Sequence, residues 1–300
     1  MKKFLLIDGN SVICRAYYAL PNLSFNGVNT GGTYCFVNIL NRILKKFDPT
    51  HILVAFDVSS KYTFRRKIDS QYKANRIFVD NPDLVVQFQF IKELLNLLEI
   101  KYDSVYGFEA DDVIATYVSQ SQYDNYIITG DKDLFQLISD TTRIIFPKKG
   151  ISNVEVIDIR EFRRNYTIEP SQFVDVKSLI GDSGDNVKGI EGIGIVSAIK
   201  LLLEYQSVEK IIEVSDSIKG KIGSRIRANL DRIKMAKQLV SLRRDVPINY
   251  CVDHCCVKVD WKKALEFFRK LGFKSIIDRF KKQMIDQKVN REALEQGYEF

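Results

Sequence analysis

The stretch Phe4-Leu5-Leu6-Ile7-Asp8 is a short apolar run that ends in an acid, and it sets the pattern for the first half of the chain. Similar apolar runs follow at residues 51–56, 101–105, 125–129 and 143–146. Their length is typical of buried strands. Helical patterns lie between them at residues 31–47, 81–98 and 109–119. The alternation predicts an α/β fold with a mostly parallel central sheet flanked by helices.

Acids stand where these strands are expected to end. Asp8, Asp57 and Asp131 each follow an apolar run, and the carboxyl ends of parallel strands meet at the edge of the sheet where ligands bind. Two like charges ~4 Å apart in an effective dielectric near 20 cost on the order of 4 kcal/mol. Carboxylate oxygens suit hard ions such as Mg²⁺. We therefore expect divalent metal there, with further acids from helix starts and turns: Glu109, Asp111, Asp112, Asp133, Asp182 and Asp185.

Taken singly, each of these acids has an ordinary structural explanation. Acids at residues 109–112 suit the positive end of a helix dipole, and Asp133, Asp182 or Asp185 could cap a helix or close an Asx turn. The metal hypothesis depends on the set as a whole, because several separate acidic sites at strand and helix ends are not expected by accident.

The charge outside these acids favours a polyanionic substrate. The 300 residues carry 45 Lys and Arg against 38 Asp and Glu, a net charge of +7. The nine acids named above leave 29 others against those 45 bases, and such a surface attracts nucleic acid. The two histidines, His51 and His254, make Ser-His-Asp chemistry improbable.

The sequence gives no sign of a membrane or an oxidising compartment. No apolar stretch reaches the ~18 residues that a membrane helix needs. The apolar run at the start is too short for an export signal, and the five cysteines have no paired spacing. A reduced, cytoplasmic location is expected.

The second half of the chain changes character. Helical patterns occupy residues 170–180, 195–205 and 224–242, with short linkers and no long strand. We predict an α/β core over residues 1–166 and a helical region over residues 167–300.

Five motifs, in this order and spacing, resemble those of the bacterial 5′–3′ exonucleases. That family includes the N-terminal domain of DNA polymerase I and is related to flap endonucleases. The motifs are Leu6-Ile7-Asp8-Gly9-Asn10-Ser11, Phe56-Asp57, Gly107-Phe108-Glu109-Ala110-Asp111-Asp112-Val113-Ile114, Thr129-Gly130-Asp131-Lys132-Asp133 and Gly181-Asp182-Ser183-Gly184-Asp185-Asn186. The match runs from residue 3 to about residue 245 and implies a PIN-like nuclease core.

The resemblance also implies roles for the nine acids. Asp8, Asp57, Glu109 and Asp111 would hold one metal ion, and Asp131, Asp133, Asp182 and Asp185 would hold or support a second. Asp112 would support or share these ligands. The ions expected are two Mg²⁺, with Mn²⁺ as a substitute.

A basic segment lies between Asp57 and the helix at residue 81. Residues 61–76 carry six bases and one acid, which is typical either of a solvated loop or of a channel for single-stranded nucleic acid. It resembles the arch of the family, which we place at about residues 58–80. The resemblance implies phosphate-facing or DNA-binding roles for Arg15, Arg65, Tyr72, Lys73 and Arg76. Cys14 departs from the aromatic residue common before that first arginine, and Tyr17 and Tyr18 are the candidate replacements.

The loop at residues 189–194 is rich in glycine and follows a polar turn, so a dinucleotide-binding loop is a poor interpretation. It resembles the helix-hairpin-helix by which the family holds duplex DNA, here at about residues 181–205, often with bound K⁺. Val196 replaces a lysine common after that hairpin. Residues 219–244 hold nine bases and one acid, which suits duplex backbone binding. The DNA-binding candidates are Gly189, Gly192, Gly194, Ser197, Lys221 and Arg225.

Two further patterns carry less weight. Residues 251–256 hold three cysteines and a histidine, but four ligands within six residues do not readily surround one zinc ion, so we predict a strand end with small buried thiols. Cys35 is expected in the core. Residues 296–300 faintly resemble a sliding-clamp-binding tail, a pattern that usually arises by chance.

Together these observations predict a structure-specific 5′–3′ exonuclease and flap endonuclease that cuts DNA by two-metal catalysis. Its substrates would be 5′ flaps, nicked or gapped duplexes and RNA–DNA primers, in replication and repair. We expect a free-standing, monomeric nuclease that needs a separate polymerase and ligase. The alternatives are an RNA-cutting PIN-type nuclease, a non-catalytic DNA-junction binder, and a phosphotransferase with Asp8 as nucleophile.

Overall fold

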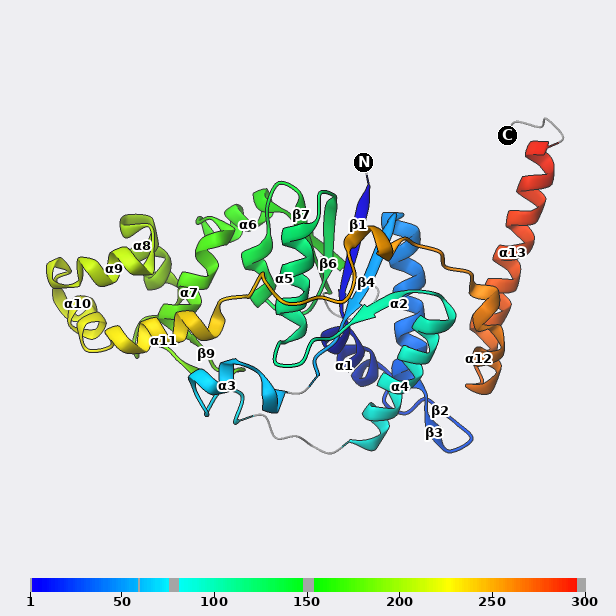
Figure 1. The fold of residues 1–300 in the computed structure, drawn as a ribbon, viewed down its shortest axis with the longest axis horizontal. Coiled ribbons are helices and arrows are strands. Elements are labelled where there is room, and N and C mark those ends of the chain that lie inside the picture. The colour runs from blue at the N-terminus through cyan, green and yellow to red at the C-terminus, as the bar shows by residue number, and fades with distance from the viewer. Residues whose placement is uncertain (1, 59, 76–80, 148–153, 296–300) are drawn as a thin grey trace. The chain divides into compact units, whose positions relative to one another are not determined.

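The computed structural model describes the backbone of residues 2–58, 60–75, 81–147 and 154–295 (Figure 1). The chain forms two compact units. The first contains residues 1–12, 47–80 and 102–256, and the second contains residues 13–46, 81–101 and 257–300. These units divide the chain differently from the predicted boundary at residue 166, which stays a prediction.

A six-stranded sheet organises the first unit, with the order β5-β4-β1-β6-β7-β8. β1 pairs in parallel with β4 and β6, β7 is parallel to β6, and β8 is antiparallel to β7. The mostly parallel α/β fold is confirmed. The strands are β1 Lys3–Asp8, β4 His51–Ala55, β5 Lys101–Asp103, β6 Asp124–Ile128, β7 Thr142–Pro147 and β8 Val154–Ile157.

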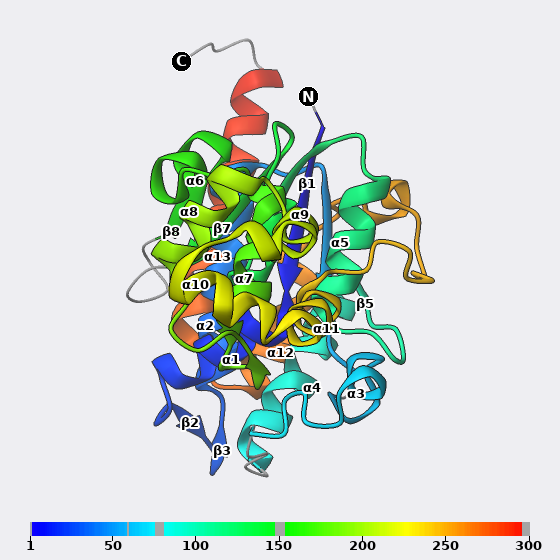
Figure 2. The same cartoon turned by 90° about the vertical axis from the view of Figure 1, so that its left-hand side faces the viewer.

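The middle strands are continuous apolar runs because both of their faces are buried. Along β1, Phe4, Leu5 and Leu6 are each 0% exposed. Phe4 and Leu6 share a cluster with residues of α5 (Ala110–Gln120), which lies beside the strands in Figure 2. Full burial of each such side chain contributes roughly 1.5–3 kcal/mol, so the strand ends are held on a rigid support.

Helices complete the first unit. Short α1 (Gly9–Ala19) begins there and runs into the second unit. The others are α3 Arg65–Ile68, α6 Ile159–Tyr166, α7 Phe173–Ile180, α8 Ile195–Tyr205, α9 Val208–Glu213, α10 Gly220–Arg227 and α11 Leu230–Val240, with 3₁₀ turns at η1 Ser60–Tyr62, η2 Asp133–Leu137, η3 Pro170–Gln172, η4 Ser215–Ser217 and η5 Val252–Cys255. A two-stranded ribbon joins β9 (Gly181–Asp182) to β10 (Val187–Lys188).

The prediction of one helix over residues 224–242 is wrong, because the chain breaks between α10 and α11. Asn229 lies at the break, where its side-chain Nδ2 donates to the carbonyl of Arg225 at 2.8 Å. An asparagine that bonds the preceding turn favours a helix end over its continuation. The two helices therefore present the basic residues of 219–244 on separate axes.

The second unit packs α2 (Gly31–Phe47) with α4 (Pro82–Leu97) around a buried amide. Gln87 is 0% exposed; its Oε1 accepts from the backbone N and Oγ1 of Thr33, each at 2.9 Å, and its Nε2 donates to the carbonyl of Asn29 at 2.6 Å. Cys35 is buried here, as expected. The remaining elements are β2 Ser24–Phe25, β3 Val28–Asn29, η6 Trp261–Ala264, α12 Leu265–Lys270 and α13 Lys274–Glu295.

The cysteine-rich stretch differs from the predicted strand end. It forms the 3₁₀ turn η5, whose last residue, Cys255, is buried, whereas the flanking Cys251 and Cys256 are exposed. Only one of the three thiols therefore reaches the interior.

Among the residues that the structure describes, no helix is both long and apolar enough to cross a membrane.

Candidate metal centre and its cationic surroundings

Asp8 is fixed at the end of β1 by two short hydrogen bonds. Its Oδ1 accepts from the backbone N of Ser11 at 3.0 Å, and its Oδ2 accepts from Thr129 Oγ1 at 2.7 Å. Gly9 follows directly: a Cβ there would lie 2.5 Å from the Phe56 ring and 2.8 Å from the carbonyl of Ala55. Only glycine lets α1 start this close to the end of β4, so the motif around Asp8 has a structural reason.

Asp57 and the first turn of α5 are held together. The Asp57 Oδ1 accepts from the backbone N of Ala110 at 2.7 Å, and the Asp57 backbone N donates to Asn10 Oδ1 at 3.0 Å. A carboxylate at this place satisfies a free N–H of the helix start and interacts favourably with the helix dipole. The strand that ends at Asp57 and the helix that begins after Glu109 thus meet at one edge of the sheet.

The pKa values of Asp8 and Asp111 are raised by burial and by the charges of neighbouring acids from separate segments. Burial raises the pKa of Asp8 to about 7; the hydrogen bonds from Ser11 and Thr129 oppose the shift, and the charges of Asp57 and Asp131 add to it. Burial also holds the pKa of Asp111 well above its usual range, and the charges of Asp131, Asp8 and Asp57 raise it further. Asp8, Asp57, Asp111 and Asp131 therefore lie near enough to interact electrostatically in the first unit.

Two further acids of the set, Asp133 and Asp182, pair with a lysine that the sequence analysis missed. Lys177 of α7 is 9% exposed, and its Nζ forms ion pairs with Asp133 and with Asp182 Oδ2, the latter at 2.5 Å. Burial alone would raise the pKa of Asp182, but the Lys177 ammonium and the backbone N–H groups of Gly184 and Asp185 lower it. Lys177 lies in an apolar helical pattern, where sequence alone indicates only an exposed polar position.

Lys73 and Tyr72 reach the same carboxylates from the basic segment. Lys73 Nζ lies 2.7 Å from Glu109 Oε1 and 3.5 Å from Asp185 Oδ2. Burial and the charges of Glu109 and Asp185 raise the pKa of Tyr72, so its phenol keeps its proton and can donate to Glu109 Oε2 at 2.9 Å or to Asp185 Oδ2 at 2.7 Å. Lys73 also has a φ of 54°, a left-handed conformation that is uncommon for lysine.

Asp112 is bound by Arg65. It is 0% exposed, and both of its oxygens bind the guanidinium of Arg65, at 2.6 and 2.7 Å. The prediction that Asp112 supports the other acids fits this geometry better than a direct metal contact does. The DNA-binding role predicted for Arg65 does not fit, because Arg65 is 2% exposed and its donors bind groups inside the protein.

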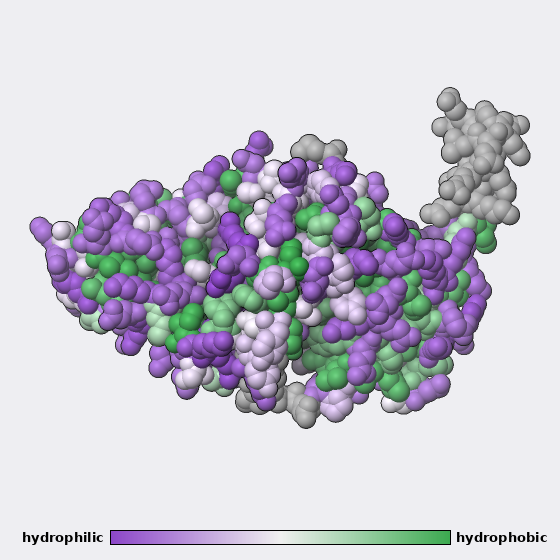
Figure 3. Space-filling model, in the orientation of Figure 1, coloured by the Kyte–Doolittle hydropathy of each residue, from purple (hydrophilic) through white to green (hydrophobic). Residues whose placement is uncertain are grey.

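The glycine-rich loop joins α7 to α8 through a close backbone crossing. A Cβ on Gly189 would lie 2.1 Å from the carbonyl carbon of Ile180, so this position needs glycine. Arg225 of α10 donates to the carbonyl of Gly192 at 3.2 Å, and Lys221 lies exposed one turn earlier on the same helix. The loop and α10 are therefore brought together, and hydrophilic residues predominate over this end of the unit in Figure 3. Gly194 caps α8 and Ser197 lies in its first turn.

Other predicted residues lie elsewhere. Arg15 is exposed on α1 in the second unit. Tyr17 is 8% exposed and Tyr18 is 68% exposed, so Tyr18 is the aromatic side chain available near Cys14. Arg76 and residues 296–300 lie outside the described residues.

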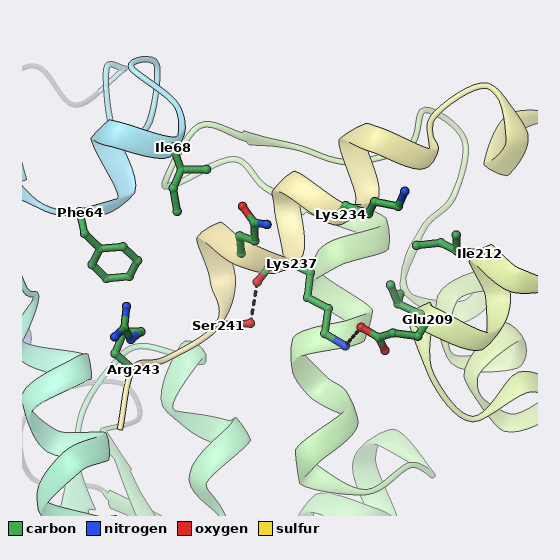
Figure 4. A pocket seen from close by; sticks show the side chains of 10 residues that line it. Phe64, Ile68, Glu209, Ile212, Lys234, Lys237, Ser241 and Arg243 are labelled. Carbon is green, nitrogen blue, oxygen red and sulfur yellow. Dashed lines mark hydrogen bonds and ion pairs between the residues drawn. The ribbon is translucent and has the colours of Figure 1, made fainter. Parts of the chain in front are cut away.

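A cavity of about 650 Å³ opens between α3, α9 and α11 (Figure 4). Phe64, Ile68 and Ile212 give it an apolar lining. Its cations have acidic partners: Lys237 pairs with Asp175 and Glu209, Arg243 with Asp245, and Lys234 lies 3.8 Å from Asp231. The cavity is close to electrically neutral and contains none of the predicted site residues.

The donor set fits hard divalent cations, since every candidate ligand is a carboxylate. In the conformation described, no three His, Cys, Asp or Glu residues of the described chain are grouped to hold one ion. The ammonium groups of Lys73 and Lys177 lie among these acids instead. These two lysines supply part of the positive charge beside the acids.

Two family models together match most of the chain. Residues 3–167 match the model described as 5′-3′ exonuclease, N-terminal resolvase-like domain, and residues 168–264 match the one described as 5′-3′ exonuclease, C-terminal SAM fold. The chain belongs to the 5′–3′ exonuclease family. The resemblance stated from the five motifs is confirmed, and the RNA-cutting and non-catalytic alternatives are not favoured.

Curated relatives agree with this membership. The chain is 37% identical over 284 residues to DNA polymerase I of Bacillus caldotenax and 38% identical over 284 residues to that of Bacillus subtilis (strain 168); each match covers 93% of this chain. The match covers 32% of either relative, so the chain spans about a third of the length of these polymerases.

Solved structures share the fold. T5 5′-exonuclease with bound zinc superposes with a TM-score of 0.68 at 21% identity, covering 95% of this chain and 99% of that one. The catalytic core of Rad2 in complex with DNA substrate superposes with a TM-score of 0.55 at 17% identity, covering 90% of this chain and 88% of that one.

The raised pKa of Asp8 makes a prediction about stability. Between the ordinary pKa of 3.8 and about 7, the folded protein keeps a proton that the unfolded chain has released. The free energy of unfolding in EDTA should therefore fall as the pH rises through this window, and Asp8→Asn should lack that loss. In urea titrations from pH 4 to pH 8, the free energy of unfolding of the variant should rise relative to that of the wild type, by on the order of 4 kcal/mol at most. Parallel pH profiles for the two proteins would contradict the burial of a charged carboxylate here.

Proposed function

We propose that this chain is a divalent-metal-dependent 5′–3′ exonuclease and flap endonuclease that hydrolyses phosphodiester bonds of DNA. The observation that carries the proposal is the convergence of acids from four segments, since the charges of Asp57 and Asp131 act on Asp8, and those of Asp131, Asp8 and Asp57 act on Asp111. Family membership gives the reaction class. The basic residues of α10 and α11 and those of the segment after Asp57 favour a polyanionic substrate.

The residues proposed to hold metal are those with carboxylate oxygens at the edge of the sheet. Asp8, Asp57, Glu109 and Asp111 would bind one ion; Asp131, Asp133, Asp182 and Asp185 would bind or support another. When bound, two divalent ions activate water and stabilise the leaving oxygen of a phosphodiester. Mg²⁺ is the proposed ion and Mn²⁺ a substitute, because both prefer oxygen ligands.

The protein's own groups orient this set. Lys73 and Tyr72 hold Glu109, and Lys177 holds Asp133 and Asp182. The two lysines thus lie beside the acids proposed to hold metal, where the phosphate of a substrate would bind. There Lys73 would stabilise the negative charge that develops during hydrolysis, with Arg15 and Arg76 proposed for the same task.

The helical part of the first unit is proposed to hold duplex DNA. Backbone N–H groups of the loop at residues 189–194 and of the start of α8 are suited to bind a phosphate. Lys221 and Arg225 lie beside them. We propose that the loop also binds K⁺. We further propose that its substrates are 5′ flaps, nicked or gapped duplexes and primers. It would act beside a separate polymerase and ligase, as a monomer in the cytoplasm. Solved relatives described with DNA support the choice of substrate.

The test is cleavage of three labelled substrates: a 5′ flap, a nicked duplex and a single-stranded RNA. We expect the flap and the nicked duplex to be cut with Mg²⁺ and not in EDTA. Asp111→Asn should abolish cutting, because it removes an acid from the buried group, while binding of the flap in Ca²⁺ stays within about twofold of the wild type. Wild-type turnover in this variant would reject the metal assignment, and preferred cutting of the RNA would reject the substrate.

Lys73→Ala makes a separate prediction, because Lys73 is buried against Glu109 whereas Lys67 of the same segment is exposed. Loss of charge stabilisation should lower single-turnover cleavage by 10²-fold or more, with the affinity for the flap duplex little changed. Lys67→Ala is the control and should change both quantities by less than about threefold. Equal losses of turnover and affinity in Lys73→Ala would place Lys73 in DNA docking.

A further inference from the structure

Arg65 is a buried arginine with each of its three nitrogens bonded. Its side chain is 2% exposed. Nε donates to the carbonyl of Leu239 at 2.7 Å, Nη1 donates to Asp112 Oδ2 at 2.6 Å, and Nη2 donates to Asp112 Oδ1 at 2.7 Å. Further contacts join Nη2 to the carbonyl of Ser241 at 2.9 Å and Nη1 to Glu109 Oε2 at 3.3 Å.

These bonds join three elements that lie far apart in the sequence. Arg65 belongs to α3 in the basic segment, Glu109 and Asp112 to the start of α5, and Leu239 and Ser241 to the end of the basic helix α11. The last carbonyls of a helix have no partner within it, so the guanidinium satisfies those of α11 while it neutralises the acids of α5. One side chain therefore determines how the basic helix ends against the acidic turn.

The bonds of Asp112 fix the acidic turn in its place. Its Oδ2 also accepts from the backbone N of Glu109 at 3.2 Å, and its Oδ1 accepts from the backbone N of Arg243 at 2.9 Å. Because both of its oxygens are bonded in this way, Asp112 holds the backbone at Glu109 in place. Arg65 acts on Glu109 twice, directly through Nη1 and indirectly through Asp112.

We infer that Arg65 is a positioning residue for the metal-binding acids: by holding the Glu109–Asp112 turn against the end of α11, it orients Glu109 and Asp111 for binding a divalent ion. The inference rests on the proposed function, since it assumes that Glu109 and Asp111 are metal ligands. It replaces the DNA contact predicted for Arg65.

The chemistry of the site requires arginine. A planar guanidinium binds both oxygens of one carboxylate and still has donors for two carbonyl groups, whereas the ammonium of lysine is a point charge with a single nitrogen. Arg65→Lys keeps the positive charge and so avoids leaving Asp112 buried without any cation. It removes the two parallel hydrogen bonds that orient the carboxylate of Asp112.

The experiment measures Mn²⁺ binding to the full chain by electron paramagnetic resonance, without substrate. Loss of a group that orients metal ligands usually costs 10- to 100-fold in metal affinity. We expect Arg65→Lys to raise the Mn²⁺ dissociation constant at least tenfold, with duplex binding in Ca²⁺ unchanged within about twofold. Arg227→Lys is the matched control, because Arg227 is a partly buried arginine of α10 that binds the carbonyls of Ser215 and Ile218, at 2.6 and 3.1 Å.

A second variant covers the case in which Arg65→Lys does not fold. Arg65→Met combined with Asp112→Asn removes both buried charges together, which proteins tolerate better than the loss of one partner. It should keep the helical circular dichroism of the wild type and show the same loss of Mn²⁺ affinity. Unfolding of both variants would leave Arg65 a purely structural residue and overturn the inference.

The remaining outcomes are also decisive. Mn²⁺ affinity within twofold of the wild type in Arg65→Lys would overturn the positioning role, and a loss of duplex affinity alone would restore the DNA contact. Asp8→Asn separates these results from a failure of the proposed function. If Asp8→Asn leaves wild-type Mn²⁺ binding intact, the ions bind elsewhere and the metal site itself is wrong.

Discussion

Repulsion among buried carboxylates is the constraint on which the rest of this structure depends. Asp8, Asp57, Asp111 and Asp131 come from four segments and interact electrostatically at the edge of a sheet whose middle strands are buried. Water screens the charges at a protein surface, but it screens the charges of these acids poorly. The folded chain must therefore carry compensating cations. Lys73 and Lys177 supply part of that charge. A divalent ion would supply more of it, which links the stability of the fold to the proposed chemistry.

The same requirement explains why basic residues that look alike in the sequence differ in the structure. Arg65 and Lys73 are buried among acids, whereas Lys67, between them in the chain, is exposed. Buried cations act on the carboxylates, and exposed ones remain available to a polyanion. The basic segment after Asp57 therefore belongs to the architecture of the acidic site as well as to the proposed substrate channel.

The sequence predicted helices and strands correctly where a periodic apolar pattern determines them. The strands β1, β4, β5, β6 and β7 and helices such as α2 and α8 lie where their apolar patterns predict. It failed where tertiary contacts decide: β8 is a short edge strand, and Asn229 splits a continuous helical pattern into two helices. Arg65 and Lys177 were misjudged or missed because burial of a charged residue depends on partners distant in the sequence, which no local pattern encodes.

The most direct test of the central claim is the anomalous diffraction of crystals grown with Mn²⁺. The account predicts manganese peaks coordinated by the carboxylates of Asp8, Asp57, Glu109 and Asp111, with a further ion on the side of Asp131 and Asp185, and with the ammonium of Lys73 displaced from Glu109. Manganese bound only at other surfaces, with Lys73 still paired to Glu109, would contradict it.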